Sequence, residues 1–316
     1  VRKAVRTCRS EKPGAVLVEL SEDIAGQDAT GEPLEPRRLR RPRPDDKVLD
    51  EAFEMLRAAR RPVIIAGNGT IRRRASSELR RFCELTGISV ISTFMAKGCV
   101  DMDADYYLFT IGLQQRDQLT QHVAASDLIV TVGYDMAEYP PRLWNVDREK
   151  LNIHIDFTPA ETDAYYHPEV ELIGDIAHSL ELLCRRAELQ NVGPVDHECQ
   201  RQTRQAMLDD FAYHRDDETE GVVKPQKALW DVRQALAPCD ILLCGVGAHK
   251  MWVGRYYHCH EPNTCIISNG FCAMGMPLPG AIAAHMVHPD RKIFVVTGDG
   301  DFLMNVQEME TATRLG

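Results

Sequence analysis

The chain has 316 residues, of which 44% are hydrophobic and 27% are charged. This balance is typical of globular proteins, and the length predicts about two domains. The 37 Lys and Arg residues against 47 Asp and Glu residues leave a net charge of −10. Such an acidic balance argues against nucleic-acid binding, and no apolar run is long enough to cross a bilayer. We therefore expect neither a nucleic acid nor a membrane as a partner.

The ten cysteines are scattered singly along the chain, without a Cys-x-x-Cys pair. Their density is too low for a disulfide scaffold, so we expect reduced thiols and a cytoplasmic location. The chain begins at Val1, without Met and inside a predicted helix, and stops at Gly316. We interpret it as a fragment of a larger protein, an interpretation that leaves open a targeting segment upstream of Val1.

The first 24 residues predict a short helix, a turn at Lys12-Pro13-Gly14 and a strand over residues 15–20. Residues 25–46 are rich in glycine, proline and arginine, with a basic run over residues 37–44. A basic run can bind anions, but interleaved prolines are more typical of an extended, solvated linker. We predict a linker here.

Residues 47–186 alternate between helical and strand patterns. Apolar residues recur at helical spacing over 48–59 and over 76–85, and Gly87 ends the second helix. Continuous apolar runs predict strands at residues 63–66, 88–91, 128–132, 151–155 and 170–173. Strands of this kind, separated by helices, predict a parallel sheet with helices on both faces. This region is expected to be a complete, three-layer, Rossmann-like α/β domain.

Residues 187–224 are polar, with one predicted helix over 197–213, and we interpret them as a second linker. From Pro225 the alternation resumes, with a helix followed by strands at residues 240–244, 264–268 and 293–297. Residues 225–316 are therefore predicted to form the first half of a further α/β domain. The fold class is α/β throughout, with parallel sheets.

The sharpest motif is Gly298-Asp299-Gly300, which follows the last predicted strand and precedes a helix from about Asn305. Glycines allow backbone N–H groups to approach a phosphate closely, and a carboxylate is a ligand that Mg²⁺ prefers. The tripeptide alone fits a tight turn with a capping Asp equally well.

Two further loops follow the two preceding strands, one with His249 and one with Met274. Taken singly, His249 is typical of a surface or capping residue and Met274 of a core residue. The carboxyl ends of parallel strands lie at one edge of a sheet, where open α/β sheets bind ligands. Three glycine-rich loops in order therefore predict one phosphate-binding crevice.

The three loops resemble those of the pyrophosphate-binding domain of thiamine-diphosphate enzymes of the acetolactate synthase type. The first reads Gly-x-His-x-Met-Trp from Gly247, the second ends in Met274-Gly275, and the third reads Gly-Asp-Gly-x-Phe-x-Met-Asn from Gly298. Residues 1–24 resemble the end of the pyrimidine-binding domain of that family, 47–186 its central domain, and 225–316 the first half of its pyrophosphate domain. The resemblance implies thiamine diphosphate and Mg²⁺ as cofactors.

Carried over to this sequence, the family pattern implies Asp299 as a Mg²⁺ ligand. It implies a cofactor site formed by Gly247, Ala248, His249, Cys272, Met274, Gly298, Asp299, Gly300 and Asp301, with Asp301 acting largely through its backbone. The activating glutamate is expected upstream of Val1, so no catalytic residue is expected in this chain, and a second metal ligand is expected beyond Gly316. Three positions depart from the family: Gly245 replaces a common Asp, Ala248 a common Gln and Cys272 a frequent Gly.

The resemblance implies an acetolactate synthase catalytic subunit, acting on pyruvate or a related 2-keto acid in branched-chain amino acid biosynthesis or the acetoin pathway. It implies a homodimer or homotetramer, with the isolated fragment inactive. One alternative is another thiamine-diphosphate-dependent 2-keto acid decarboxylase or carboligase. The other is an inactive fragment that acts only as a binding module.

FAD, which many biosynthetic members carry, is not expected. After Gly133, where those members have an arginine-rich run, this chain reads Tyr134-Asp135 and later Glu138-Tyr139-Pro140-Pro141, which resembles the flavin-free catabolic type. Bulky rings and acids would crowd and repel a pyrophosphate linker, although the loop 67–69 (Gly-Asn-Gly) could still admit a nucleotide phosphate. The aromatic residues there predict a packed loop. A zinc site at His258-Cys259-His260 with Cys265 is not expected, because adjacent residues rarely converge on one ion.

Overall fold

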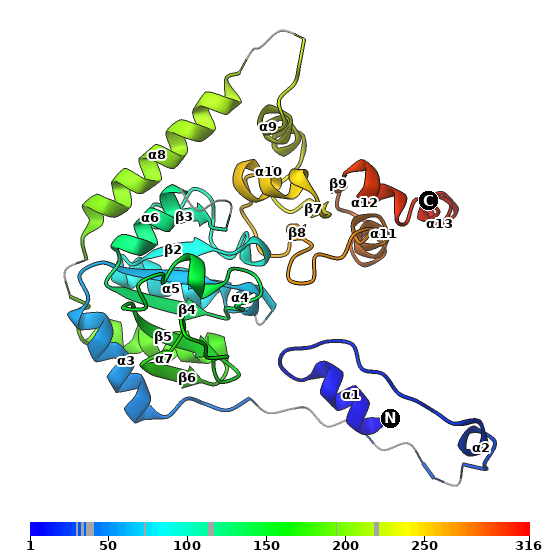
Figure 1. The fold of residues 1–316 in the computed structure, drawn as a ribbon, viewed down its shortest axis with the longest axis horizontal. Helices are drawn as coiled ribbons and strands as arrows, with labels where there is room; N and C mark the ends of the chain where they lie inside the picture. The colour runs from blue at the N-terminus through cyan, green and yellow to red at the C-terminus, as the bar shows by residue number, and fades with distance from the viewer. Residues whose placement is uncertain are drawn as a thin grey trace. The chain divides into compact units, whose positions relative to one another are not determined.

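The computed structural model describes residues 1–29, 31–32, 35, 41–72, 74–112, 117–193, 195–217 and 221–316. These residues form two compact units, Val1–Pro42 and Arg43–Gly316. Most of the basic run that predicted a linker, residues 36–40, lies outside the described residues. The elements of both units are labelled in Figure 1.

The first unit contains the helices α1 (Arg2–Arg9) and α2 (Glu22–Ala25). The predicted helix and turn are present, but the predicted strand over residues 15–20 is wrong. These residues have no strand conformation, and Leu17 is 93% exposed. A strand needs a ladder of backbone hydrogen bonds to a neighbour, and the described residues of this unit provide no strand to pair with.

A six-stranded parallel sheet forms the centre of the second unit, as predicted for residues 47–186. Its strands are β1 (Pro62–Ala66), β2 (Ser89–Ser92), β3 (Tyr107–Thr110), β4 (Leu128–Val132), β5 (Leu151–Asp156) and β6 (Val170–Ile173). Their order is β3-β2-β1-β4-β5-β6, the doubly wound order in which the chain reverses direction between β1 and β4. Sequence analysis did not identify β3, a four-residue strand with a register shift against β2.

Helices flank this sheet and bury its apolar side chains. They are α3 (Asp46–Ala58), α4 (Asn68–Arg72), α5 (Ser76–Thr86), α6 (Gln118–Ala125) and α7 (Ile176–Leu189), with single 3-10 turns η1 (Phe94–Ala96) and η2 (Pro141–Leu143). Their ends follow local chemistry: the Asp45 side chain accepts a hydrogen bond from the Lys47 N–H, and Gly87 ends α5 in a left-handed conformation.

The segment interpreted as a second linker contains a long helix, α8 (His197–Arg215), that packs against the first domain. Met207 and Phe211 are buried, and the Phe211 ring meets Phe109 of β3 edge to face with ring centroids 4.9 Å apart. Arg204 lies over the same Phe109 ring and donates a hydrogen bond to the Tyr107 carbonyl at 2.7 Å. Helix α8 is therefore part of the folded unit.

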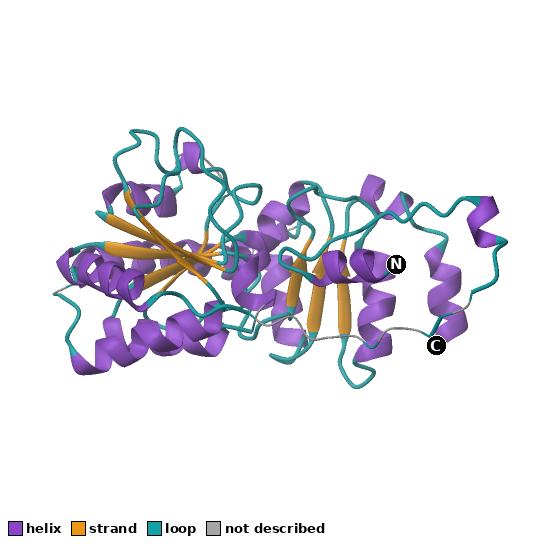
Figure 2. Ribbon diagram, turned by 90° about the horizontal axis from the view of Figure 1, so that it is seen from below, coloured by secondary structure: helices purple, strands orange, loops and turns teal. Residues whose placement is uncertain are grey.

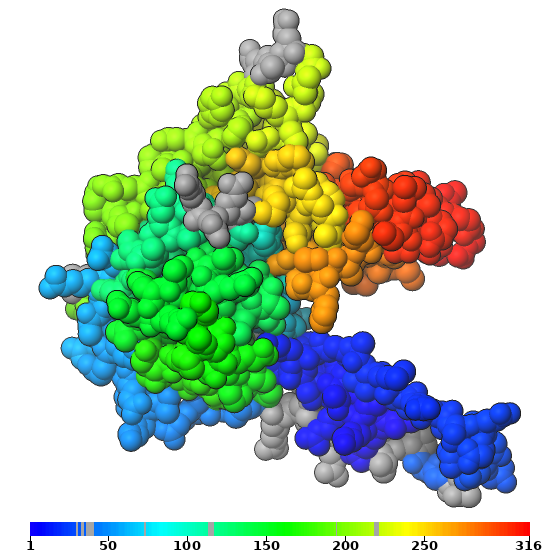
Figure 3. Space-filling model, in the orientation of Figure 1, coloured from blue at the N-terminus to red at the C-terminus, as the bar shows by residue number. Residues whose placement is uncertain are grey.

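A second, three-stranded parallel sheet follows, with the order β8-β7-β9. Its elements are α9 (Pro225–Ala235), β7 (Ile241–Cys244), α10 (Ala248–Tyr256), β8 (Cys265–Ile267), α11 (Pro277–Val287), β9 (Ile293–Val296), α12 (Asp299–Leu303) and α13 (Glu308–Leu315). Figure 2 shows the two sheets as separate groups of strands. Helices α11 to α13, orange and red in Figure 3, expose large apolar side chains such as Met286, Val287 and Leu303.

Buried charged groups join elements of the two sheets. The Lys97 ammonium, fully enclosed just after η1, donates to the Gly254 carbonyl of α10 at 2.8 Å, and burial lowers the pKa of Lys97. Arg255 of α10 forms an ion pair with Asp117, at the start of α6, at 2.6 Å. The side chains of this pair are only 10% and 5% exposed, so each charge depends on its partner for solvation.

We predict that Asp117→Ala lowers the free energy of unfolding by about 3–5 kcal/mol, because it leaves the buried Arg255 charge uncompensated. Equilibrium urea unfolding measures the change. Asp231→Ala removes the carboxylate of the more exposed pair Lys227–Asp231 and is the matched control, with an expected change below about 1 kcal/mol. Equal effects in the two variants would contradict a special role for the buried pair.

Candidate functional site

The second sheet reverses its winding between β7 and β9, and the three glycine-rich loops begin at the carboxyl ends of its strands. This is the position at which open α/β sheets bind ligands. The third loop contains a short helix that was not predicted, α12, which begins at Asp299 with Gly298 as its N-cap. The helix expected from about Asn305 begins at Glu308 as α13. The Phe302 N–H closes the turn of α12 onto the Gly298 carbonyl at 2.8 Å.

Asp301 holds the loops together through its side chain. Its carboxylate is 1% exposed and accepts hydrogen bonds from the Gly275 N–H at 2.7 Å and from the Thr297 hydroxyl at 2.6 Å. A Cβ at position 245 would lie 1.6 Å from its Oδ2 atom. The Asp301 side chain therefore has a structural role in the fold, and Gly245 is the residue that leaves room for its carboxylate. The expected backbone contact of Asp301 with the cofactor stays a prediction.

His249 lies among the same loops, in the first turn of α10. A Cβ at Gly247 would lie 2.8 Å, and one at Gly298 3.2 Å, from the Cε1 atom of its ring. Burial lowers the pKa of His249, and the adjacent Lys250 acts in the same direction while Asp301 opposes both. The ring is therefore neutral at neutral pH. Its Nε2 atom is buried without a hydrogen-bond partner and lies 3.8 Å from the Asp301 carboxylate.

The loop after β8 is tied to the loop after β9. The Asn305 side chain donates to the Gly275 carbonyl at 2.9 Å, so both backbone polar groups of Gly275 are held by residues of or beside α12. Met274, 43% exposed, places its methyl group 3.6 Å from where a Cβ of Gly300 would be. Met274 and the Gly-Asp-Gly loop are thus neighbours, as the predicted cofactor site requires.

Cys272 occupies a left-handed backbone conformation, with φ at +50°. Glycine adopts this conformation without strain, so the glycine expected here from the family resemblance would fit the same loop. The Lys250 ammonium bridges the Cys272 Sγ at 3.2 Å and the Asn269 Oδ1 at 3.0 Å. The Asn269 Nδ2 is buried without a partner. Sequence analysis did not select Lys250 or Asn269 as site residues, because neither carries a motif of its own.

These residues fit a diphosphate and a divalent ion. Asp299, Gly247 and Ala248 are exposed at the ends of the loops, so a carboxylate and backbone N–H groups are accessible to a ligand. The unpartnered His249 Nε2 and Asn269 Nδ2 are polar atoms that a phosphate oxygen can satisfy. Lys250 adds a positive charge beside them. A hard carboxylate oxygen suits Mg²⁺, which usually shares its ligands with substrate phosphates.

The crevice of the first sheet, between the ends of β1 and β4, is closed by backbone packing. A Cβ at Gly69 would lie 2.5 Å from the Gly133 Cα, and a Cβ at Gly67 would lie 2.4 Å from the Gly133 carbonyl oxygen. The glycines of this loop therefore serve a close approach of two chain segments. No residue other than glycine fits at these positions without moving the backbone.

Glu138 binds backbone N–H groups beside this crevice. Its carboxylate accepts hydrogen bonds from the Asn68 N–H and the Met95 N–H, each at 3.2 Å, and burial raises its pKa. Tyr134, Tyr139 and Trp144 are buried beside it, and the Trp144 indole donates to the Tyr134 hydroxyl at 3.2 Å. The prediction of a packed aromatic loop is confirmed.

The residues rejected as a zinc site do not converge. His258 is partly buried, and desolvation lowers its pKa to about 3. The Cys259 thiol is hydrogen-bonded to the Thr264 hydroxyl at 3.2 Å. His260 instead faces Asp101, 3.2 Å away. Within the described residues, a search for metal-binding groups finds His260 together with Asp101 and Asp103.

Comparisons with known proteins agree with this geometry. A family model for the thiamine pyrophosphate enzyme central domain matches residues 49–183. A second model, for the C-terminal TPP binding domain of the same family, matches residues 245–316. The chain therefore belongs to the thiamine pyrophosphate enzymes, and its two parallel sheets are their central and C-terminal domains.

The similar proteins include acetolactate synthases. The chain is 28% identical over 319 residues to acetolactate synthase of Bacillus subtilis (strain 168), covering 100% of this chain and 55% of that protein. It is 32% identical over 327 residues to the catabolic acetolactate synthase of Raoultella terrigena, covering 100% and 56%. It is 31% identical over 323 residues to chloroplastic acetolactate synthase 2 of Nicotiana tabacum, covering 98% and 48%. The chain thus spans about half the length of these curated relatives.

Helices capable of spanning a membrane are absent from the described part of the chain.

We predict that Asp301→Ala lowers the free energy of unfolding by about 1–3 kcal/mol without any cofactor present, since the buried Gly275 N–H loses its acceptor. Thermal and urea unfolding measure this loss. Asp299→Ala is the matched control, because its side chain is exposed in the same helix turn, and its expected effect is below about 0.5 kcal/mol. If both variants were equally stable, the Asp301 carboxylate would not hold the loops together.

Proposed function

We propose that the protein is a thiamine-diphosphate-dependent carboligase of the acetolactate synthase type. It decarboxylates pyruvate and joins the remaining two-carbon unit to a second 2-keto acid, giving 2-acetolactate and CO₂. The observation that carries the proposal is the convergence of three glycine-rich loops on His249 and Asp301 at the switch point of the second sheet. The whole-chain similarity to acetolactate synthases supports the choice of reaction.

In this proposal each loop has a defined role. Asp299 ligates Mg²⁺, which neutralises the diphosphate of the cofactor. Gly298, Gly300 and the backbone of Asp301 contact the diphosphate from one side, and Gly247, Ala248 and the Nε2 of His249 contact it from the other. Met274, next to Gly300, supports the cofactor from below. Thiamine diphosphate, when bound, supplies the electron sink for decarboxylation and carbon–carbon bond formation.

Other parts of the proposal concern the whole protein. We propose a homodimer or homotetramer in a reducing compartment such as the cytoplasm, in keeping with the ten free cysteines. We also propose that residues 1–316 by themselves do not turn over pyruvate, since the similar enzymes are nearly twice as long as the matched region. The activating glutamate then comes from outside this chain.

We further propose that the enzyme works without FAD. The Asn68 N–H lies in the loop that could admit a nucleotide phosphate, and it already donates to the Glu138 carboxylate. A phosphate at that position would meet a buried carboxylate and the packed side chains of Tyr134 and Tyr139. Like charges at hydrogen-bond distance in a buried site repel each other strongly. These contacts support a flavin-free enzyme of the catabolic type.

The metal site gives the main test. In the full-length protein we expect pyruvate, Mg²⁺ and thiamine diphosphate to yield 2-acetolactate, and Asp299→Ala to weaken Mg²⁺-dependent cofactor binding about 100-fold or more. Loss of a group that merely supports a metal ligand already costs about 10- to 100-fold, and loss of the ligand itself costs at least as much. Calorimetry with the cofactor and product analysis measure both effects.

Asp290→Ala is the control for that experiment, because Asp290 is exposed at the amino end of β9, away from the loops. Its binding and activity are expected to match those of the unmodified protein. Release of an aldehyde without 2-acetolactate would favour a decarboxylase on the same scaffold. Cofactor binding without any turnover of the full-length protein would favour a binding module.

For the flavin, we predict that the purified full-length protein is colourless and that added FAD changes neither its activity nor its unfolding temperature. The physical reason is the occupied crevice described above. Absorbance spectroscopy of the denatured supernatant measures any flavin carried through purification. One flavin per chain, with activity lost when it is stripped, would contradict the proposal.

A further inference from the structure

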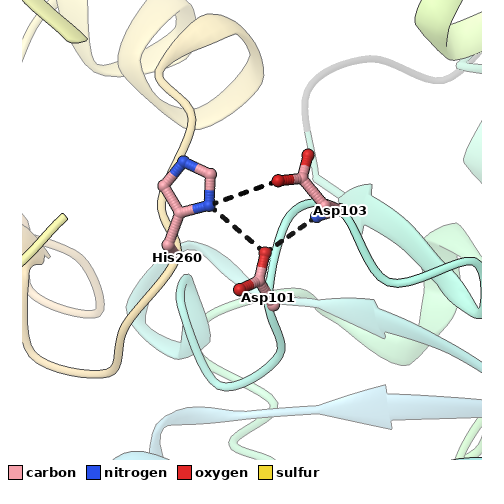
Figure 4. Close-up of side chains that lie close together, drawn as sticks. All are labelled: Asp101, Asp103 and His260. Carbon is pink, nitrogen blue, oxygen red and sulfur yellow. Dashed lines mark hydrogen bonds and ion pairs between the residues drawn. The ribbon is translucent and has the colours of Figure 1, made fainter. Parts of the chain in front are cut away.

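Three side chains with metal-ligating atoms converge where the two sheet domains meet, outside the cofactor site. Asp101 and Asp103 lie in the segment between η1 and β3, and His260 lies between α10 and β8 (Figure 4). The His260 Nδ1 atom is 3.2 Å from the Asp101 Oδ1 and 3.8 Å from the Asp103 Oδ2. Asp103 is 86% exposed and His260 26%, so the cluster is open to solvent.

Two carboxylates face one ring nitrogen of His260 (Figure 4). A bare lone pair at Nδ1 would be repelled by both, so this nitrogen either carries a proton, as in the neutral Nδ1–H tautomer, or binds a metal ion. The 3.2 Å separation from the Asp101 Oδ1 fits a hydrogen bond, and the set of three ligand atoms also fits a metal ion.

The separations suit a metal ion. Ligands bound tetrahedrally to zinc at about 2.0–2.1 Å stand about 3.3 Å from one another. The donor atoms of Asp101, Asp103 and His260 all lie within 4.8 Å of one another, and the shortest separation is 3.2 Å. Small side-chain rotations of the exposed Asp103 therefore complete a three-ligand site, and water can occupy the remaining position.

The backbone around the cluster is held in place by a separate residue. Arg80 of α5 donates hydrogen bonds to the carbonyls of Gly98 at 3.3 Å, Cys99 at 3.2 Å and His260 at 3.2 Å. It thereby fixes the two segments side by side through their backbones. The ligand set is thus positioned before any ion binds, which lowers the entropy cost of binding.

We propose that Asp101, Asp103 and His260 bind a divalent transition-metal ion of the Zn²⁺ class that links the two sheet domains. A nitrogen ligand with two carboxylates favours Zn²⁺ over Mg²⁺, which prefers oxygen ligands alone. The ion cross-links segments that are 159 residues apart between Asp101 and His260. Its role is structural, and it is independent of the thiamine-diphosphate site.

The test uses the purified full-length protein and zinc chloride alone. Calorimetry is expected to show zinc binding, and the unfolding temperature is expected to rise with zinc and not with magnesium. Asp103→Asn and His260→Gln each weaken zinc binding by about tenfold or more, corresponding to about 1.4 kcal/mol. Asp105→Asn, an exposed aspartate of the same loop outside the cluster, leaves zinc binding unchanged.

Because Asp103 is exposed, Asp103→Asn keeps the fold and isolates the loss of a ligand. If zinc affinity is unchanged in both Asp103→Asn and His260→Gln, the proposal is overturned, and the contact between His260 and Asp101 is a hydrogen bond only. If only Asp299→Ala abolishes zinc binding, the ion binds at the cofactor loops, and this result also overturns the proposal. None of these measurements uses thiamine diphosphate or pyruvate, so their outcome is separate from that of the proposed function.

Discussion

The buried Asp301 carboxylate is the interaction on which the candidate cofactor site depends. A carboxylate removed from water must find hydrogen-bond donors, and here they come from other parts of the site: the Gly275 N–H and the Thr297 hydroxyl. The space for it exists only because position 245, at the end of β7, has no side chain. The hydrogen bonds of Asp301 thereby fix the loops at the ends of all three strands relative to one another. The exposure of Asp299 and the unpartnered Nε2 of His249 are consequences of that arrangement.

The same topology produces an open crevice in one sheet and a closed one in the other. Both sheets have a switch point with glycines at the strand ends. In the second sheet the side chains that converge there leave polar atoms unsatisfied. In the first sheet Gly67, Gly69 and Gly133 bring two backbones into contact, and Glu138 takes up the free N–H groups. Glycine at a strand end thus lets another group approach the backbone closely. The neighbouring side chains determine whether that group is a ligand or another segment of the protein.

Sequence patterns predicted most of the fold and the outline of the site. Helices with clear apolar spacing and end signals, such as α3 and α5, have the predicted bounds within two residues. The patterns failed where strand formation depends on hydrogen bonding to a neighbouring strand. The apolar run 15–20 lacks a partner strand, whereas β3 is a strand because it pairs with β2. They also missed what depends on distance in space. The grouping of Asp101 with His260 and the side-chain role of Asp301 join residues that no local motif connects.

The three departures from the family pattern are compatible with the proposed recognition of phosphate through backbone groups. Gly245 and Asp301 are coupled, because a side chain at 245 and a buried carboxylate at 301 compete for one space. Ala248 lies in the exposed first turn of α10, where a backbone N–H is available whatever the side chain. Cys272 adopts the left-handed conformation that glycine prefers and gains a contact with Lys250. A site that reads phosphate through backbone groups tolerates such exchanges as long as the loop conformation is kept. Changes at Asp299, where the side chain itself is the proposed ligand, have no such tolerance.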